Sequence, residues 1–249
     1  ASDPAAAQVD RLNPDAAYAA GNLAVISRQA ALARGGVNVA EAVQRARRAE
    51  AGGETESGLD AAVWWRLAAL RSYATPLPFH EAAQLPLAVL PPNRVRLLNA
   101  VQGLQALVTL SFAASGWSTR TRAMAALLPE HTLRHDFNLF VGAIAPRVLE
   151  AGPDTRAVRR AREDAWLHER AQRRWQQFAL SLGEAGVEAL LAQATAQGLA
   201  PVRILSHAAE QATEGWALAP APRAARRRTA PPPPVPASRG SASRLHAAR

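Results

Sequence analysis

The sequence predicts a mainly α-helical protein, in which a small ββα-like unit is followed by an irregular multi-helix domain and a disordered tail. Alanine supplies 59 of the 249 residues, and alanine is the best helix former, whereas β-branched residues are few here. Capping residues alternate with glycine and proline breaks along the middle of the chain, which is typical of one short helix after another. The residues after 218 include no acidic side chain and are too polar and proline-rich to form a core.

Three parts follow from these shifts in composition: a ββα-like unit at 1–36, a multi-helix domain at 37–218 and a disordered tail at 219–249 rich in Arg, Pro and Ala. The net charge of +9 comes entirely from arginine, because the chain has no lysine. The first two parts hold 22 arginines against 20 acidic residues, and the tail holds seven arginines against none. The charge therefore gives no indication that the folded body binds nucleic acid.

Several functional classes are excluded or disfavoured at once. The chain has no cysteine, which excludes disulfides, thiolate zinc sites, iron–sulfur clusters and cysteine nucleophiles. The uncharged stretch Leu97–Thr119 is long enough to span a bilayer, but it contains Asn99, Gln102 and Gln105. We interpret it as a buried central helix, and we expect a cytoplasmic protein with no membrane contact and no cofactor.

The first part is predicted from local signals. Residues 8–12 can end a strand, and Asn13-Pro14-Asp15 has the composition of a turn. Asn22 is a suitable cap for a helix that runs to about Arg34, where Gly35 and Gly36 would stop it.

The second part is predicted to be a succession of helices. Asn38 with Glu41 resembles a capping box, and Ser57 with Asp60 repeats the pattern. Pro146 should kink or break one helix, and Gly183 should stop another. The expected helices cover 39–51, 58–74, 79–85, 93–114, 118–128, 131–150, 153–182 and 184–197, and a short extended segment is expected at 201–205.

One stretch, residues 9–30, resembles part of the HNH endonuclease family. The residues that match the family's pattern are Asp10, Arg11, Asn13, Pro14, Tyr18, Gly21, Asn22, Val25, Ile26, Ser27 and Ala30. The resemblance implies a ββα finger in which a histidine base activates water beside a divalent metal. Asn22 would match the asparagine that orients this base.

The departures from the pattern predict that catalysis has been lost. Arg11 stands where the family has its histidine, and the first histidine of the chain is His80. The late asparagine and lysine of the pattern fall at Ala31 and Arg34. What the resemblance leaves is the turn, Asn22, and a basic helix with Arg28 and Arg34. The alternative is a coincidence, in which Asn22 caps a helix, Tyr18 packs under a turn and Asp10 pairs with Arg11.

A second candidate site is the polar cluster around His135 and Asp136. A histidine beside an aspartate can act as an oriented base, and His131 lies one helical turn before His135, a spacing found in metal sites. Adjacent helical residues do not face each other, however, and the intervening residues lack the glutamate of zinc hydrolases. We therefore favour a helix-start cluster and predict no metal site.

Two classes of function stay open. The first is a nucleic-acid-associated protein descended from an HNH nuclease, which binds DNA or RNA through Arg11, Arg28, Arg34 and the tail residues Arg226, Arg227 and Arg228. The second is a helical module that binds a protein partner. The tail arginines can equally belong to a solvated linker. Enzymatic activity is not expected of this chain; a metal-dependent HNH endonuclease would need a preceding segment to supply its histidine and ligands.

Overall fold

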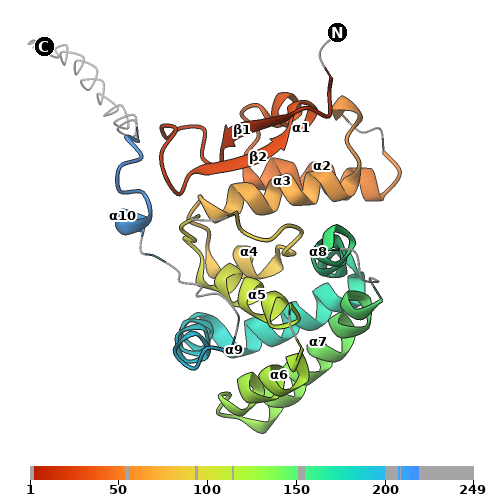
Figure 1. The fold of residues 1–249 in the computed structure, drawn as a ribbon, viewed down its shortest axis with the longest axis vertical. Coiled ribbons are helices and arrows are strands. Elements are labelled where there is room, and N and C mark those ends of the chain that lie inside the picture. Colours follow the sequence, from red (N-terminus) through yellow and green to blue (C-terminus); the bar gives the residue numbers. More distant parts are fainter. Residues whose placement is uncertain are drawn as a thin grey trace, which may run out of the picture. The chain divides into compact units, whose positions relative to one another are not determined.

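A computed structural model describes residues 3–53, 56–92, 95–113, 115–150, 155–199, 207 and 209–218. These residues belong to one compact unit that ends at residue 218, and the predicted tail and the extended segment at 201–205 lie outside them. The predicted class is confirmed, because the described residues form ten α-helices and a single sheet of two strands (Figure 1).

The first element is a ββα unit, as predicted. Strands β1 (Ala7–Arg11) and β2 (Leu23–Ser27) pair in antiparallel register, with Val9 opposite Val25. Helix α1 (Arg28–Arg34) follows at once, and the Ser27 hydroxyl caps it by accepting from the Ala30 amide at 3.2 Å. The prediction that Asn22 caps this helix is therefore wrong, because the β-branched residues after Asn22 extend into a strand.

The next two helices pack against each other beneath this unit. Helix α2 (Val39–Glu50) begins with the predicted capping box, in which both the Asn38 and the Glu41 side chains accept backbone amides. Helix α3 (Ala61–Tyr73) begins later than predicted, because Asp60 caps it, accepting from the Val63 amide at 2.7 Å. Ser57 instead adopts a positive φ of 66° in a short 3-10 turn, η1 (Glu56–Gly58).

The centre of the fold is α5 (Ala100–Ser111), which is reached through the short helix α4 (Phe79–Gln84). All but two residues of α5 are buried, as the uncharged sequence predicts. The helix is shorter than the predicted 93–114, since Asn99 is extended and ends the preceding loop. No helix in the described part of the chain combines the length and apolar character needed to cross a bilayer.

The following helices are α6 (Trp117–Ala126) and α7 (His131–Leu149). Pro146 lies in the last turn of α7 and does not end it. The helix predicted from 153 to 182 is instead divided into α8 (Thr155–Asp164), a 3-10 turn η2 (Ala165–Leu167) and the start of α9 (Glu169–Ala196). The division sets Trp166 fully in the core. The predicted stop at Gly183 is confirmed as a local break in α9, where its φ is 73°.

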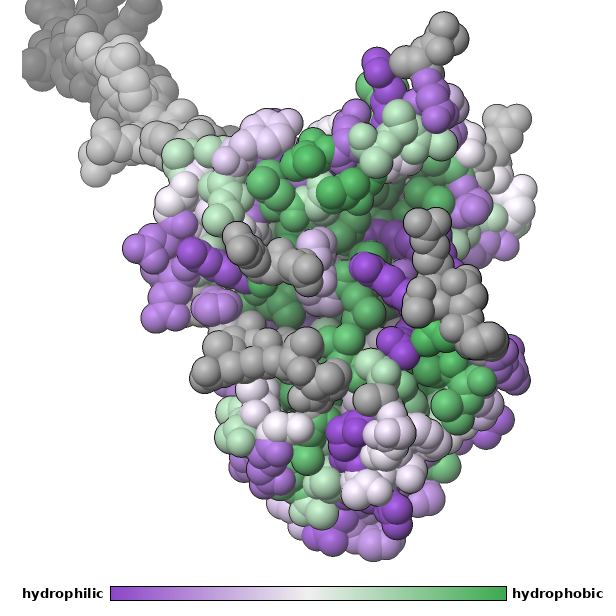
Figure 2. Space-filling model, viewed as in Figure 1, coloured by the Kyte–Doolittle hydropathy of each residue, from purple (hydrophilic) through white to green (hydrophobic). Residues whose placement is uncertain are grey.

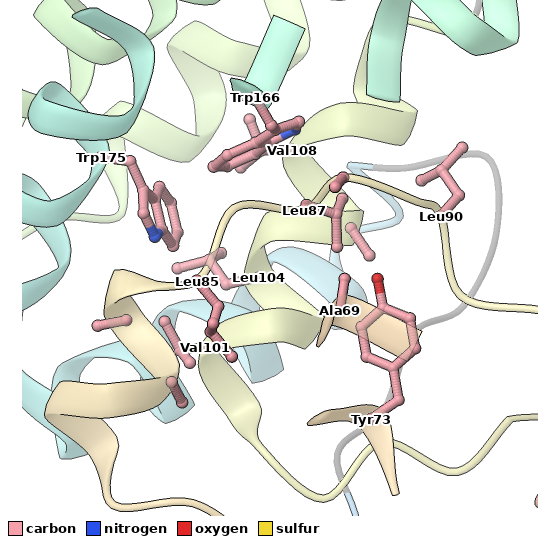
Figure 3. Close-up of a cluster of buried hydrophobic side chains, with 14 of the residues drawn as sticks. Ala69, Tyr73, Leu85, Leu87, Leu90, Val101, Leu104, Val108, Trp166 and Trp175 are labelled. Carbon is pink, nitrogen blue, oxygen red and sulfur yellow. The ribbon is translucent and has the colours of Figure 1, made fainter. Parts of the chain in front are cut away.

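The core combines many small alanines with a few large aromatic rings. Trp166 and Trp175 meet edge to face with their ring centroids 5.2 Å apart, and Phe140 lies 5.1 and 5.2 Å from them. Trp166 also donates to the Thr109 hydroxyl at 2.8 Å. Figure 3 shows the two tryptophans beside leucines of the α4–α5 region, with Tyr73 below them.

The last described helix, α10 (Ala209–Ala212), returns the chain to its N-terminal unit. Trp216 is fully buried, and its indole donates to the Ala20 carbonyl at 3.1 Å. Its own carbonyl accepts from the Ala17 amide at 2.6 Å. The loop between β1 and β2 is therefore held from two sides, by the hairpin itself and by a segment almost two hundred residues later.

Candidate functional site

The loop between β1 and β2 is organised around Asn22. This side chain is fully buried; its amide oxygen accepts from the Asn13 amide at 2.7 Å, and its nitrogen donates to the Asn13 and Ala17 carbonyls at 3.1 and 2.9 Å. These three bonds use the polar groups of the Asn22 amide to close the loop. The Asn22 side chain thus stabilises the loop through hydrogen bonds, and it has no free polar group left to orient a base.

The inner face of the strand pair carries an ion pair. The Arg34 Nη2 atom lies 2.7 Å from the Asp10 Oδ2 atom, and both side chains are largely buried. Burial lowers the pKa of Arg34 below its ordinary value, and the neighbouring Arg11 charge acts in the same direction, while Asp10 opposes the shift. Arg34 therefore points inward to Asp10 and not to an exposed surface, at which the sequence predicted a nucleic-acid contact.

The outer face presents an aromatic–cationic pair. The Arg11 guanidinium carbon lies 4.9 Å from the centre of the Tyr18 ring, and its Nη1 atom donates to the Ala16 carbonyl at 3.0 Å. The Tyr18 side chain projects outward, with 65% of its surface exposed. The carbonyl bond and the ring contact hold Arg11 in one position beside an open aromatic face.

The rest of the outer face is apolar and ends at a second arginine. Side chains alternate across a sheet, so Val9 and Val25 share the face of Arg11, and both are more than half exposed. Figure 2 shows apolar side chains gathered over the hairpin. Arg28, the first residue of α1, is exposed just beyond the opposite end of the strand pair, where its backbone amide donates to the Ala6 carbonyl. The five residue steps from Arg11 to Ala6 separate Arg11 from this end by about 17 Å.

A further arginine, Arg71, lies behind the unit and was not singled out from the sequence. It belongs to the last turn of α3 and is only 9% exposed. Burial lowers the pKa of Arg71, and the nearby charge of Arg34 lowers it further. The available signal was an arginine flanked by apolar residues near the end of a tryptophan-containing helix, which is a rare position for an unpaired charge.

The structure does not bring the side chains of the second predicted cluster together. His131 and His135 are exposed on the first turns of α7, whereas Asp136 is buried and accepts from the Gln177 side chain at 3.2 Å. The adjacent His135 and Asp136 side chains thus lie in different environments. Within the described ranges, no group of three histidine, aspartate or glutamate side chains is placed to hold a metal ion.

The remaining predicted residues are not brought together with the N-terminal unit. Arg226, Arg227 and Arg228 lie outside the described part of the chain. A pocket of about 310 Å³ lies between the start of α5 and the second half of α9, where Glu184, Glu188 and His207 border an apolar floor that includes Phe79 and Val187. None of the site residues predicted from the sequence lines this pocket.

Comparison of the chain with protein-family models, with curated proteins and with solved structures gives no match in any of the three.

Proposed function

We propose that the chain binds nucleic acid through the outer face of the ββα unit and does not cleave it. The observation that carries the proposal is the Arg11–Tyr18 pair, in which an exposed ring lies under a fixed guanidinium. Aromatic side chains stack on bases of any sequence, and arginine adds attraction to the phosphate backbone. The pair therefore supports binding of a single strand more than reading of base edges in a duplex.

The spacing along the hairpin supports a bound strand of several nucleotides. Arg11 and Tyr18 stand at one end of the hairpin and the exposed Arg28 just beyond the other, with the apolar Val9 and Val25 side chains between them. A strand laid along this face would meet positive charge at both ends and an apolar contact in the middle. Descent of the ββα unit from an HNH nuclease is part of the proposal, and it rests on the motif at residues 9–30.

The absence of cleavage is proposed on the state of the motif residues. Arg11 cannot act as a general base, since its guanidinium stays protonated in proteins. The Asp10 carboxylate is bound to Arg34, and the Asn22 amide is consumed by the loop. The three motif residues Asp10, Arg11 and Asn22 therefore offer neither a base nor a free carboxylate for a metal ion.

Fluorescence anisotropy of a short labelled single-stranded oligonucleotide tests this function. We expect the full chain to bind at low salt and Tyr18→Ala to weaken binding about tenfold, the effect of losing one stacked base. Arg170→Ala, which changes an exposed arginine on α9, serves as the control and should bind like the parent chain. Incubation with plasmid and Mg²⁺ should leave the plasmid intact. Equal affinities for Tyr18→Ala and the parent chain would exclude the proposed face.

A protein partner on the same hairpin is the second candidate function. It is favoured by the Val9–Val25 pair, whose side chains are 55% and 69% exposed at directly opposite positions. An exposed apolar patch on a sheet is a common protein contact surface. This candidate predicts no oligonucleotide binding by the full chain at low salt, the outcome that would exclude the first.

A further inference from the structure

Arg71 is a buried cation, and its Nη1 nitrogen has no hydrogen-bond partner among the described residues. Its Nη1 atom is inaccessible to solvent and contacts no acceptor in the described part of the chain. The residues that follow it in α3, Ser72 and Tyr73, are both fully buried. Taking a guanidinium out of water is costly unless a carboxylate or other acceptors replace its hydration. The described residues therefore leave the Arg71 guanidinium without the acceptor that its burial requires.

The charges around Arg71 add to the cost of burying its guanidinium group. Arg34 exerts the strongest charge effect on Arg71, and it is repulsive, while helices α1 and α3, which carry the two residues, are in contact. One carboxylate that attracts Arg71, Asp10, is already bound to Arg34 at 2.7 Å. Asp15 and Glu41 also attract Arg71, and the Glu41 carboxylate accepts from the Asn38 backbone amide.

Two other arginines of the ββα unit also have buried donors without an acceptor in the described part of the chain. The Nε atoms of Arg11 and Arg34 are buried and have no acceptor among the described residues. Arg34 is within electrostatic reach of both Arg11 and Arg71. Each of the three arginines therefore has a buried donor without an acceptor among the described residues, and Arg34 repels both Arg11 and Arg71.

We propose that Arg71 and Arg34 form a binding site for an oxyanion of the phosphate class, at the junction of the ββα unit and α3. Guanidinium groups hold such anions through several charge-assisted hydrogen bonds, and a tetrahedral anion can accept from donors that arrive from different directions. The site does not rest on the proposed function, because Arg71 and Arg34 lie behind the outer face of the hairpin; a phosphodiester group is one source of its ligand. Free phosphate shares the same chemistry and is the other source.

Inorganic phosphate tests the site without any nucleic acid. Thermal unfolding of the full chain is followed in sodium phosphate and in sodium chloride of equal ionic strength. We expect a saturable rise in Tm in phosphate, its loss in Arg71→Met, and its retention in Arg170→Met, which alters an exposed arginine. Without phosphate, Arg71→Met should be at least as stable as the parent chain, because an apolar side chain of similar size replaces an unpaired charge.

Two results would overturn the site. One is a Tm of the parent chain that responds to phosphate no more than to chloride. The other is a lower Tm for Arg71→Met in phosphate-free buffer, which would show that Arg71 is already paired within the chain. Phosphorus NMR titration of inorganic phosphate with the parent chain provides a reading that needs no variant to fold; no saturable shift would also contradict the site.

Oligonucleotide binding then identifies the source of the anion. If Arg71→Met loses the phosphate response and binds the labelled oligonucleotide severalfold more weakly, the site holds a phosphodiester. If it loses the phosphate response and binds the oligonucleotide unchanged, the site holds a free phosphate-class anion. If the parent chain responds to phosphate and binds no oligonucleotide, the proposed function fails and the anion site stands.

Discussion

The Arg34 guanidinium donates to the Asp10 carboxylate across 2.7 Å and so joins the last turn of α1 to strand β1. The acidic residue of the HNH-like motif is thereby neutralised by a cation of the chain itself. In this structure the pair is a packing element of the ββα unit. Substitution of either residue measures how much the ion pair contributes to the free energy of unfolding.

Asp10→Asn should lower the free energy of unfolding by about 2 to 3 kcal/mol, because it leaves the Arg34 charge buried without a partner and beside Arg71. Arg34→Met should cost less, since it also removes the repulsion with Arg71. Urea denaturation followed by circular dichroism measures both. Glu169→Gln, which breaks the exposed pair with Arg173, is the control and should cost only a few tenths of a kcal/mol. Equal small losses for all three variants would show that the buried pair adds no stability.

Asn22→Ala should destabilise the chain by about 2 to 3 kcal/mol, since it removes three hydrogen bonds and leaves the Asn13 amide without its acceptor. The loop that carries Tyr18 should loosen with it, so oligonucleotide binding should fall as well. Asn138→Ala, at an exposed position of α7, should change neither quantity. Retained stability in Asn22→Ala would contradict the role of this amide in closing the loop.

Thr109→Val should cost about 1 to 2 kcal/mol although it nearly preserves the volume of the side chain. The substitution leaves the buried Trp166 indole without its acceptor, and an unsatisfied buried donor carries a desolvation penalty. Chemical denaturation followed by tryptophan fluorescence provides the measurement. The exposed Thr119→Val on α6 is the matched control. A neutral Thr109→Val would mean that the indole does not depend on this bond.

The burial of Tyr73 predicts that the free energy of unfolding falls at alkaline pH. Burial raises the pKa of Tyr73 well above its ordinary value of 10.0, and Glu163 adds to the shift. The folded state therefore keeps the proton that the unfolded chain loses, so this stability is complete below about pH 10 and declines as the pH rises further. In Tyr18→Phe, which leaves Tyr73 as the only tyrosine, tyrosinate absorbance should appear together with the loss of helical circular dichroism. Ionisation before unfolding would contradict the burial of Tyr73.

Local chemistry was enough to predict those helix ends that depend on their own residues. Asn38 and Glu41 form both bonds of the capping box, and Gly183 takes the positive φ that permits a break. Both features require only residues within one turn of each other. The buried course of α5 could likewise be predicted, because an uncharged helix in a chain this polar must lie inside.

The errors arise where distant residues decide the local structure. Asn22 looks like a cap, but pairing of β1 with β2 continues the chain as a strand and moves the cap to Ser27. The long helix predicted from 153 to 182 is interrupted because Trp166 packs against Phe140 and bonds to Thr109. Phe140 and Thr109 belong to other helices, so their contacts with Trp166 leave no pattern in the sequence of residues 153–182.

The candidate site could be predicted only in part for the same reason. The motif indicated Arg11, whose outward position follows from the strand register, and Arg28, which is exposed at the start of α1. It also indicated Arg34, which the fold turns inward to Asp10 across 24 positions of sequence. Arg71 could not be connected with this unit, because its environment is created by the packing of α3 against α1.

The central claim, that the outer face of the hairpin binds nucleic acid, is tested most directly by the salt dependence of oligonucleotide affinity. Each arginine that neutralises a phosphate of a single strand adds about 0.7 to the slope of log affinity against log salt. The parent chain is compared with Arg11→Gln, with Arg28→Gln, and with a chain in which Arg226, Arg227 and Arg228 are all glutamine. We predict a smaller slope and weaker binding for each hairpin variant, even though these variants keep all three tail arginines. A slope that falls only in the tail variant would contradict the claim and assign the binding to the tail.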